Sequence, residues 1–566
     1  MKYVNKIWPV IFILIFSLFS FTPFFIKGFF PIHDDTQVAR VFEMSKALKD
    51  GVFPVRWSED LGYGYGYPIF NYYDPLAYYI GGSINAAGVN ALSATKIMMI
   101  AAIILSALSM YLLASEFWGI WGGILSSLLY VYAPYHAVDI YVRGDFAETL
   151  AYAFIPLVFY GLFKTYKNLK WQYVLITTLS VAAIIISHNL TALMISPFII
   201  LFALYLIIKS DNKKKTAGLI FFGILAGLLI SAFYSIPAIF EMKFTNVISQ
   251  IGGGANFRDH FVCLPQLWSS PWGYGGSAKG CIDGLSFMVG KYHIIISAVV
   301  FLLSIFFLIS SKYKEVFKKD KEKFVLIIGF YFSFLFSLFI MLNFSKPIWE
   351  IIKPMTYIQY PWRFLIISVF FSSFISGGFF WIIRKFIKDN FINAVLGIVL
   401  AFFIIFVSVK FFVPQLILDK TSDDYTNLFT LKWTTSKISD EYMPQNFQKP
   451  KSFNQSANLQ SLNNSGFQIS NITQKTQELT FNYKSLKDTS IIVPLAYFPA
   501  WNAYLDGKII NTLENKKGTL VDIKKGEHSL SFHFQQTPLE EAANALSLTG
   551  IVLLVAGIIR LRRKYE

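Results

Sequence analysis

Charged residues are scarce in this 566-residue chain. Asp, Glu, Lys and Arg together make up 15% of it, whereas about 25% is usual for a soluble globular protein. Apolar residues make up 55%, with 58 phenylalanines, and the mean hydropathy is +0.50. This balance excludes an ordinary soluble protein with one large core. It predicts a chain that crosses a membrane several times.

Cysteine and histidine are also few. The chain has two cysteines and seven histidines, and the histidines are scattered without the close spacing of a zinc-ligand motif. No small-residue cleavage site follows the first apolar run, so we expect a retained helix there and not a signal peptide. The net charge is +16, but the basic residues fall in short clusters between apolar runs. This pattern is typical of cytoplasmic loops and not of nucleic-acid binding.

Twelve apolar segments have the length, or nearly the length, that a transmembrane helix needs, which is about 17–25 residues. Their cores contain no Asp, Glu, Lys or Arg. A thirteenth segment, 75–90, is shorter and interrupted by glycine. If it lies along the outer surface and the N-terminus is cytoplasmic, every strongly basic loop falls on the cytoplasmic side. The twelve predicted spans are 7–26, 97–115, 117–134, 149–163, 171–187, 190–208, 217–240, 294–311, 324–342, 364–383, 391–409 and 542–559.

This topology divides the chain into three parts. Residues 1–412 form a transmembrane domain with outer loops 27–96, 135–148 and 241–293. Residues 413–541 show the alternation of β-strands and the turn pairs Asp506-Gly507 and Lys525-Gly526, which predict a β-sandwich-like extracytoplasmic domain. Residues 542–566 form the final transmembrane helix and a basic cytoplasmic tail.

The first outer loop opens with PIHDDTQVAR, which places Asp34 and Asp35 beside His33 where the chain leaves the membrane. The residues that follow have the pattern of an amphipathic helix suited to lying in the interface. One interpretation is that either aspartate caps this helix. The other is that the carboxylates are reactive groups of an enzyme that works at the lipid surface.

An aromatic stretch follows, with eight aromatic residues within 63–79, among them Tyr67 and Tyr73. Such residues often anchor a protein at the membrane interface. Here three glycines allow tight folding, and two prolines prevent one long helix. A folded, tyrosine-rich loop of this kind favours a surface that binds a sugar or a lipid headgroup.

Several motifs occur in an order that resembles a known family. They are HDD at 33–35, GVFPVRW at 51–57, GYGYPIFNYYDPL at 64–76, YVRGDFAETLA at 141–151, SHNLTALM at 187–194, QYPWRF at 359–364 and YFPAWNAYLDGK at 497–508. The chain is similar over essentially its whole length to the YfhO-like and 6-pyruvoyl-tetrahydropterin-synthase-related bacterial membrane proteins, within the GT-C class of membrane glycosyltransferases. No single motif is specific, and their order carries the resemblance.

The resemblance implies an enzyme of the plasma or inner membrane that moves a sugar from a polyprenyl-phosphate carrier to an extracytoplasmic polymer or glycan. By motif position, Asp34 is the general base, and Asp35 is a helix cap or a metal ligand. The leaving lipid phosphate needs a fixed cation, for which Arg363 comes first and Arg143 second. A divalent cation, Mg²⁺ or Mn²⁺, would be held by Asp34, Asp35 and His33.

Each further candidate has a plainer interpretation. Arg363 could reach toward lipid headgroups, and Arg143 could form a structural ion-pair cluster with Asp145 and Glu148. His188 is either a substrate-site residue or a satisfied interfacial histidine. The two cysteines, Cys263 and Cys281, both fall in one outer loop, where they could form a disulfide or remain reduced.

Two other functions compete with the transferase. A transporter or flippase of lipid-linked glycans would carry ionisable residues within the membrane, and the predicted spans lack them. A non-catalytic membrane scaffold would use the β-rich domain to recruit partners.

Overall fold

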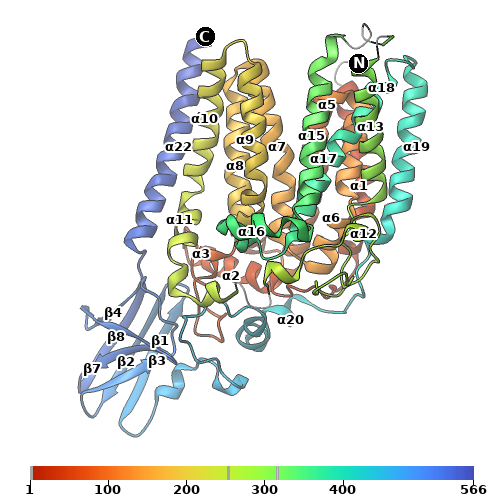
Figure 1. Ribbon diagram of the computed structural model, residues 1–566. Coiled ribbons are helices and arrows are strands. Elements are labelled where there is room, and N and C mark those ends of the chain that lie inside the picture. Colours follow the sequence, from red (N-terminus) through yellow and green to blue (C-terminus); the bar gives the residue numbers. More distant parts are fainter. Residues whose placement is uncertain (1–3, 251–254, 311, 314, 316–317, 566) are drawn as a thin grey trace.

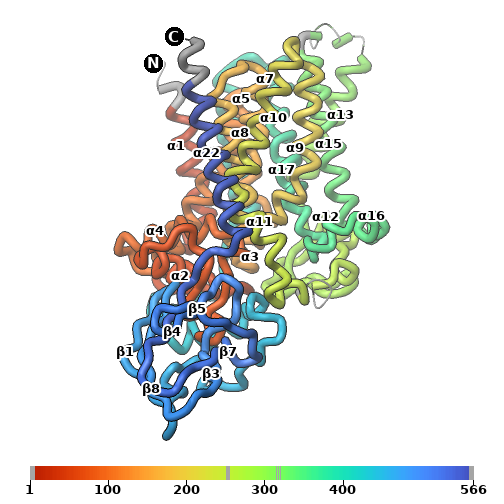
Figure 2. Tube along the Cα trace, turned by 90° about the vertical axis from the view of Figure 1, so that its left-hand side faces the viewer, coloured from red at the N-terminus to blue at the C-terminus, as the bar shows by residue number. Residues whose placement is uncertain are grey.

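The computed structural model describes residues 4–250, 255–310, 312–313, 315 and 318–565. It contains a bundle of long helices with a β-rich region at one end, which we call the β end (Figure 1). Short helices gather between the bundle and the strands, and Figure 2 shows α2 and α4 at this boundary. Helix α1 begins at the opposite end of the bundle, and α22 runs toward that end (Figure 1).

In the part of the chain that the structure describes, the bundle consists mainly of eleven helices. They are α1 (Val4–Ser17), α5 (Ala91–Val131), α7 (Phe146–Asn168), α8 (Trp171–Ser187), α9 (Asn189–Lys209), α10 (Lys213–Ile230), α13 (Lys291–Ile309), α15 (Lys321–Phe339), α17 (Leu365–Ser376), α19 (Asn390–Ser408) and α22 (Pro538–Tyr565). Shorter helices connect them: α2 (Gln37–Lys49), α3 (Ile69–Tyr72), α4 (Leu76–Ala86), α6 (Pro134–Val138), α11 (Ala232–Phe240), α12 (Leu264–Trp268), α16 (Lys346–Ile351), α18 (Gly378–Ile383), α20 (Ser422–Thr426) and α21 (Ser436–Ile438).

Helix α5 turns back on itself. Gly119 has a φ of 76°, far from helical values. The Ser127 hydroxyl donates a hydrogen bond to the Ala107 carbonyl at 2.7 Å, although twenty residues of straight helix would separate these groups by about 30 Å. The predicted spans 97–115 and 117–134 are therefore two antiparallel arms joined at Gly119.

Eight helices of the described chain are long and apolar enough to cross a membrane. The pair α10 and α11, bent by 63°, would make a ninth span. This confirms a multi-pass helical membrane protein, while the count of twelve spans stays a prediction, and residue 311 at the end of one predicted span lies outside the described residues. Segment 75–90 contains only α4, whose 11 residues extend about 16 Å, too short to cross.

Basic residues gather at the end of the bundle opposite the β end. Lys164 pairs with Glu116 at 2.8 Å, and Lys385 pairs with Asp320. The first pair joins the last turns of α7 to the end of the first arm of α5, and the second joins the residues just after α18 to the start of α15, so these helix ends lie side by side in pairs. The separation of this basic end from the β end agrees with the pattern of the predicted topology.

The β-rich region consists of two antiparallel sheets, in the strand orders β1-β2-β8-β4-β5 and β3-β7-β6. The predicted Asp506-Gly507 turn is confirmed: both residues have positive φ, and Leu505 pairs with Lys508 across it. The strands are β1 (Phe467–Lys475), β2 (Glu478–Ser485), β3 (Thr489–Val493), β4 (Trp501–Leu505), β5 (Lys508–Ile510), β6 (Thr512–Asn515), β7 (Gly518–Ile523) and β8 (Gly526–Phe534).

The β-rich region packs directly on the first outer loop. Trp57 lies with its ring 5.4 Å from that of Trp501 in β4. Asn71 donates a hydrogen bond of 2.6 Å to Glu540 at the start of α22, and Arg56 lies 3.7 Å from the same carboxylate. These buried polar contacts fix the first outer loop against the strands and the last helix.

Helix α2 differs from the surface helix that its sequence predicts. It is buried on most of its circumference, including the polar residues Gln37, Arg40 and Glu43. Its N-cap is Thr36, without a side-chain capping hydrogen bond, so neither preceding aspartate caps it. The amphipathic pattern was misleading because α4, α20 and the arms of α5 cover the helix, a tertiary arrangement that periodicity does not reveal.

Candidate active site

Two outer segments that are far apart in the sequence meet at the β end of the bundle. The backbone N–H of His33 donates to the Val142 carbonyl, and that of Asp34 donates to the Arg143 carbonyl, each at 3.0 Å. These two hydrogen bonds hold the HDD motif beside the YVRGD motif. The backbone thus places the acidic residues of both motifs at one site.

The carboxylate of Asp34 has no partner among the described residues. Among the described residues it forms no hydrogen bond and no ion pair, although its backbone is held firmly. Burial raises the pKa of this carboxyl and the charge of Asp145 raises it further, while Arg40, Arg143 and Arg363 lower it. A carboxylate with a raised pKa and free oxygens is suited to accept a proton.

Asp35 faces a different partner. Its carboxylate lies 3.6 Å from the ammonium group of Lys420, in the segment that precedes α20. Burial raises the pKa of Asp35, and the charge of Lys420 opposes this. The interpretation of Asp35 as a helix cap is therefore wrong, because an ion pair holds the side chain in place of the backbone of α2.

His33 also turns away from the neighbouring aspartates. Its Nε2 lies 2.9 Å from the Tyr274 carbonyl, in the outer segment between α12 and α13. With Asp35 bound to Lys420, the structure does not bring His33, Asp34 and Asp35 together as one ligand set. His33 contacts a backbone carbonyl, Asp35 contacts Lys420, and the Asp34 carboxylate has no partner among the described residues.

Arg143 is the centre of a buried ionic cluster. It ends a π-helical turn, Asp139–Arg143, and contacts Asp139 at 2.5 Å, Asp145 at 2.8 Å and Glu148 at 2.7 Å. Its guanidinium also lies 5.0 Å from the ring centre of Trp362. Three carboxylates surround one cation, so Arg143 has little capacity left to bind a substrate phosphate.

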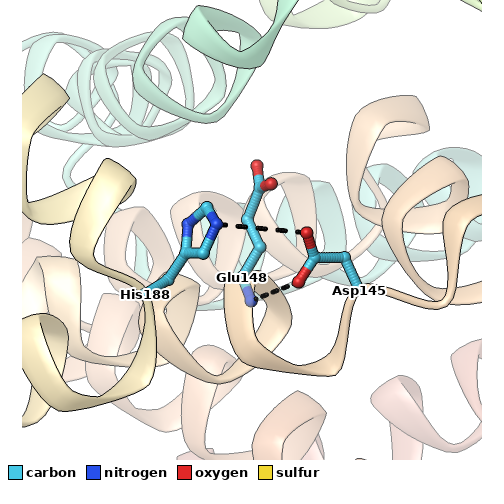
Figure 3. Close-up of side chains that lie close together, drawn as sticks. All are labelled: Asp145, Glu148 and His188. Carbon is cyan, nitrogen blue, oxygen red and sulfur yellow. Dashed lines mark hydrogen bonds and ion pairs between the residues drawn. The ribbon is translucent and has the colours of Figure 1, made fainter. Parts of the chain in front are cut away.

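Asp145, Glu148 and His188 form a compact group (Figure 3). Their potential ligand atoms all lie within 4.8 Å of one another, and all three residues are buried. Nε2 of His188 lies 4.0 Å from Asp145, and its Nδ1 contacts the Thr191 hydroxyl at 2.7 Å. Burial raises the pKa of Asp145, but the charges of Arg143, His188 and Arg363 outweigh burial and lower it to about 2. The group therefore offers two carboxylates and an imidazole to a cation.

Arg363 has the free hydrogen-bonding groups that Arg143 lacks. Its side chain donates one hydrogen bond, to the Ile358 carbonyl at 3.3 Å, and its buried Nε–H has no partner among the described residues. The guanidinium lies 5.4 Å from the ring centre of Tyr360. Its charge acts on both Asp34 and Asp145 without an ion pair to either.

The aromatic loop supplies one wall of the site. Arg40 lies 4.0 Å from the ring centre of Tyr73 and donates to the Ser439 hydroxyl at 2.9 Å. Tyr67 is fully buried and donates to the Ser439 carbonyl at 3.1 Å. Tyr73 therefore lies beside the charged groups, whereas Tyr67 holds the aromatic loop against the linker before the strands.

The sequence interpretation missed Asp74, Arg40 and Asp139. Asp74 accepts hydrogen bonds from the Tyr234 hydroxyl at 2.7 Å and from the Asn189 backbone at 2.9 Å, directly beside His188. Asp74 belongs to the NYYDPL motif, where the sequence predicted no role for the aspartate. An aspartate between two tyrosines and a proline was the available signal.

We expect Asp74→Asn to stabilise the protein at high pH only. Burial raises the pKa of Asp74 from 3.8 to about 7, against the Tyr234 and Asn189 hydrogen bonds that lower it. A folded-state pKa above the unfolded one means that stability falls as the pH rises from about 4 to about 7 and is then constant. The variant should therefore gain thermal stability in detergent above pH 7, on the order of a few kcal/mol, and match the wild type near pH 4.

The matched control is Asp419→Asn, which changes an exposed aspartate paired with Lys27. It should leave the stability nearly unchanged at every pH. A gain for Asp74→Asn that is the same at pH 5 and pH 8 would contradict the expected titration.

The two cysteines are joined in the structure. Cys263 and Cys281 form a disulfide with their Cα atoms 5.5 Å apart. The bond lies in the segment between α11 and α13, which also holds the His33 contact at Tyr274. It therefore closes the outer segment that borders the candidate site.

The charged cluster at one end of a multi-pass helical bundle defines a membrane protein with a buried polar site at the boundary of its outer segments. A family model described as 6-pyruvoyl-tetrahydropterin synthase related domain, membrane protein, matches residues 70–414, more than half of the chain. The chain belongs to this family, as its motifs indicated.

A curated relative from Lactococcus lactis subsp. cremoris (strain MG1363), an uncharacterised protein, is 26% identical over 242 residues. The match covers 41% of this chain and 39% of that protein, so the chain spans under half of its relative's length.

Two solved structures are similar in part. The mycobacterial arabinofuranosyltransferase AftD has a TM-score of 0.44 at 11% identity, over 73% of this chain and 27% of that one. The Archaeoglobus fulgidus oligosaccharyltransferase has a TM-score of 0.45 at 13% identity, over 80% of this chain and 62% of that one. At scores this low, neither similarity establishes a shared activity.

Proposed function

We propose that this protein is a GT-C-type glycosyltransferase that moves a sugar from a polyprenyl-phosphate carrier to an extracytoplasmic acceptor, a cell-surface polymer or glycan. One observation carries the proposal. The free carboxylate of Asp34 and the free N–H groups of Arg363 lie at the same end of the bundle, close enough for their charges to interact but without an ion pair. Transfer from a phosphate carrier requires a base and a cation that do not neutralise each other, with the substrates between them.

The chemistry follows from these two side chains. The acceptor hydroxyl gives its proton to Asp34 as its oxygen attacks the anomeric carbon of the donor sugar. The bond between this carbon and the phosphate oxygen breaks, and the negative charge that develops on the leaving phosphate is stabilised by Arg363. Arg143, already held by three carboxylates, positions Asp145 and Glu148 and does not bind the donor.

The orientation is part of the proposal. The basic residues at the end opposite the strands favour a cytoplasmic location for that end. The site and the β-rich region, with its sandwich-like pair of sheets, are then extracytoplasmic, in the plasma or inner membrane, with both termini cytoplasmic. This arrangement places the reaction where a lipid-linked sugar meets an external acceptor.

A divalent cation fits the group of Asp145, Glu148 and His188. The two carboxylates of this group, Asp145 and Glu148, share one arginine, Arg143, which leaves negative charge that a cation would balance. Carboxylate oxygens with an imidazole nitrogen suit Mn²⁺, and carboxylates suit Mg²⁺. Such an ion would supply positive charge beside the donor phosphate.

We expect chelation to reduce sugar transfer and added Mn²⁺ or Mg²⁺ to restore it. His188→Ala should raise the cation concentration that is needed by about ten- to a hundredfold, while His528→Ala, in strand β8 of the β-rich region, should not change it. Cation binding to purified protein, measured by calorimetry, checks the site without reference to activity. Full transfer after chelation, together with no measurable binding, would remove the cation from the proposal.

The function itself is tested first in cells and then in proteoliposomes. A strain that lacks the protein should lose a sugar from a surface glycan, and the wild-type gene should restore it. Purified protein should then release polyprenyl phosphate from a radiolabelled polyprenyl-phosphate sugar only when the acceptor is present. Movement of the labelled lipid across the bilayer without sugar transfer would establish a flippase instead, and surface glycans unchanged by deletion would leave a scaffold.

A further inference from the structure

A cavity lies away from the candidate site, where the aromatic loop, the segment before β1 and the β-rich region meet. It encloses about 550 Å³. Its lining includes Trp57, Tyr65, Phe453, Asn458, Gln474 and Trp501. Side chains from three separate parts of the chain therefore form one enclosed surface beyond the end of the helical bundle.

The lining has the composition of a sugar-binding surface. Aromatic rings provide flat apolar faces, and side-chain amides provide paired donors and acceptors. Lys432 and Lys475 add positive charge, whereas the acid in the lining, Glu59, is already paired with Lys46 at 3.0 Å. The cavity thus offers stacking and hydrogen bonds with little negative charge.

Two buried polar atoms of this lining have no partner. The indole N–H of Trp501 lacks a hydrogen-bond acceptor among the described residues, although the side chain is only 4% exposed. The Ser456 hydroxyl is also without a described partner. Both atoms are closed off from the cavity in this conformation, so a ligand oxygen would reach them only after a shift of the lining side chains, and the stacking faces and amides of the lining are what favour a ligand.

The cavity is connected to the candidate site by helix α2. Gln37, at the Asp34 end of this helix, and Lys46 are nine residues apart, a rise of about 14 Å. Lys46 contacts Glu59 in the cavity lining. A ligand in the cavity is therefore too distant to react at Asp34, but a chain molecule could occupy both places.

We infer that this cavity is a binding subsite for an oligosaccharide chain, the part of the acceptor that precedes the reacting end. The inference rests on the proposed function for the identity of the acceptor. Binding energy from a remote subsite increases affinity for a long acceptor without entering the chemical step. Its loss should therefore raise KM for a polymer and leave kcat unchanged.

The test uses the full-length protein in nanodiscs and the surface polysaccharide purified from a strain that lacks this protein. Phe453→Ala combined with Gln474→Ala removes one exposed ring and one amide from the lining without disturbing the core. Affinity for the polysaccharide, measured by biolayer interferometry, should fall at least about tenfold. The matched control is Tyr504→Ala with Gln468→Ala, which likewise removes one aromatic ring and one amide from the same region but outside the lining, and its affinity should equal the wild type.

A second variant tests the aromatic face of the lining. Trp501→Phe keeps a smaller aromatic ring in the core and reduces the ring surface that lines the cavity, and it should also weaken polysaccharide binding. Equal affinity for the wild type and both lining variants, or no binding by the wild type, would overturn the inference. Failure of the proposed function gives a different result, because sugar transfer would then be absent in every protein while equilibrium binding is still measured.

Discussion

Asp34→Asn is expected to produce a protein that folds and inserts but transfers sugar at least a hundredfold more slowly. The amide is nearly the same size as the carboxylate, and no hydrogen bond or ion pair to a described residue is lost. The variant cannot accept the acceptor proton, and general-base catalysis typically contributes about 10²–10⁴-fold. The measurement is the rate of radiolabelled sugar transfer to the acceptor by protein purified at wild-type yield.

The control for Asp34→Asn is Asp35→Asn, which changes the neighbouring carboxylate. This side chain pairs with Lys420 at a partly exposed position, so its loss should change the rate by a small factor. Burial raises the pKa of Asp34, and wild-type transfer should therefore decline on acidification at a higher pH than for an ordinary aspartate. Undiminished transfer by Asp34→Asn, with a large loss in Asp35→Asn, would move the base to Asp35.

Arg363→Gln is expected to reduce transfer by about 10²–10³-fold, the usual cost of losing one group that stabilises developing negative charge. The guanidinium contributes little to the fold, since among the described residues it donates a single hydrogen bond, of 3.3 Å, to a backbone carbonyl. Arg363→Lys keeps the charge and should recover part of the rate, although a lysine cannot bind phosphate through two N–H groups. Inhibition by added polyprenyl phosphate should weaken in parallel.

Arg258→Gln provides the control, because this exposed arginine pairs with an exposed glutamate, Glu350, and should retain full activity. Arg143→Gln provides a contrast. It would leave three buried carboxylates without their cation, and breaking a buried ion pair costs about 3–5 kcal/mol, so we expect loss of folded protein. Normal transfer and normal inhibition in Arg363→Gln would exclude Arg363 as the phosphate ligand.

Local patterns were enough to predict the helices and the main turn of the β-rich region. Long apolar runs specify membrane helices because the bilayer core accepts few charges. The Asp506-Gly507 pair indicated its hairpin because both residues tolerate a positive φ. The break predicted between spans 97–115 and 117–134 lies close to the reversal observed at Gly119.

The sequence could not predict which charged residues are free and which are paired. Arg143 and Arg363 both stand at helix ends. Three carboxylates surround Arg143, whereas no carboxylate of the described residues pairs with Arg363. Likewise, adjacent aspartates face different partners, and His188 joins Asp145 and Glu148 across some forty residues. Ion pairing depends on distances of a few ångströms between segments that no local pattern relates.

By itself, the sequence determined that this protein crosses the membrane many times, which family it resembles, and which outer segments carry its acidic and aromatic residues. Only the tertiary structure decided that the Asp34 carboxylate has no partner among the described residues, that Arg363 and not Arg143 has free N–H donors, and that a cavity lined by Trp501 lies beside the strands. The physical reason is that hydropathy acts along the chain over about twenty residues, whereas hydrogen bonds and ion pairs act across it at about 3–4 Å.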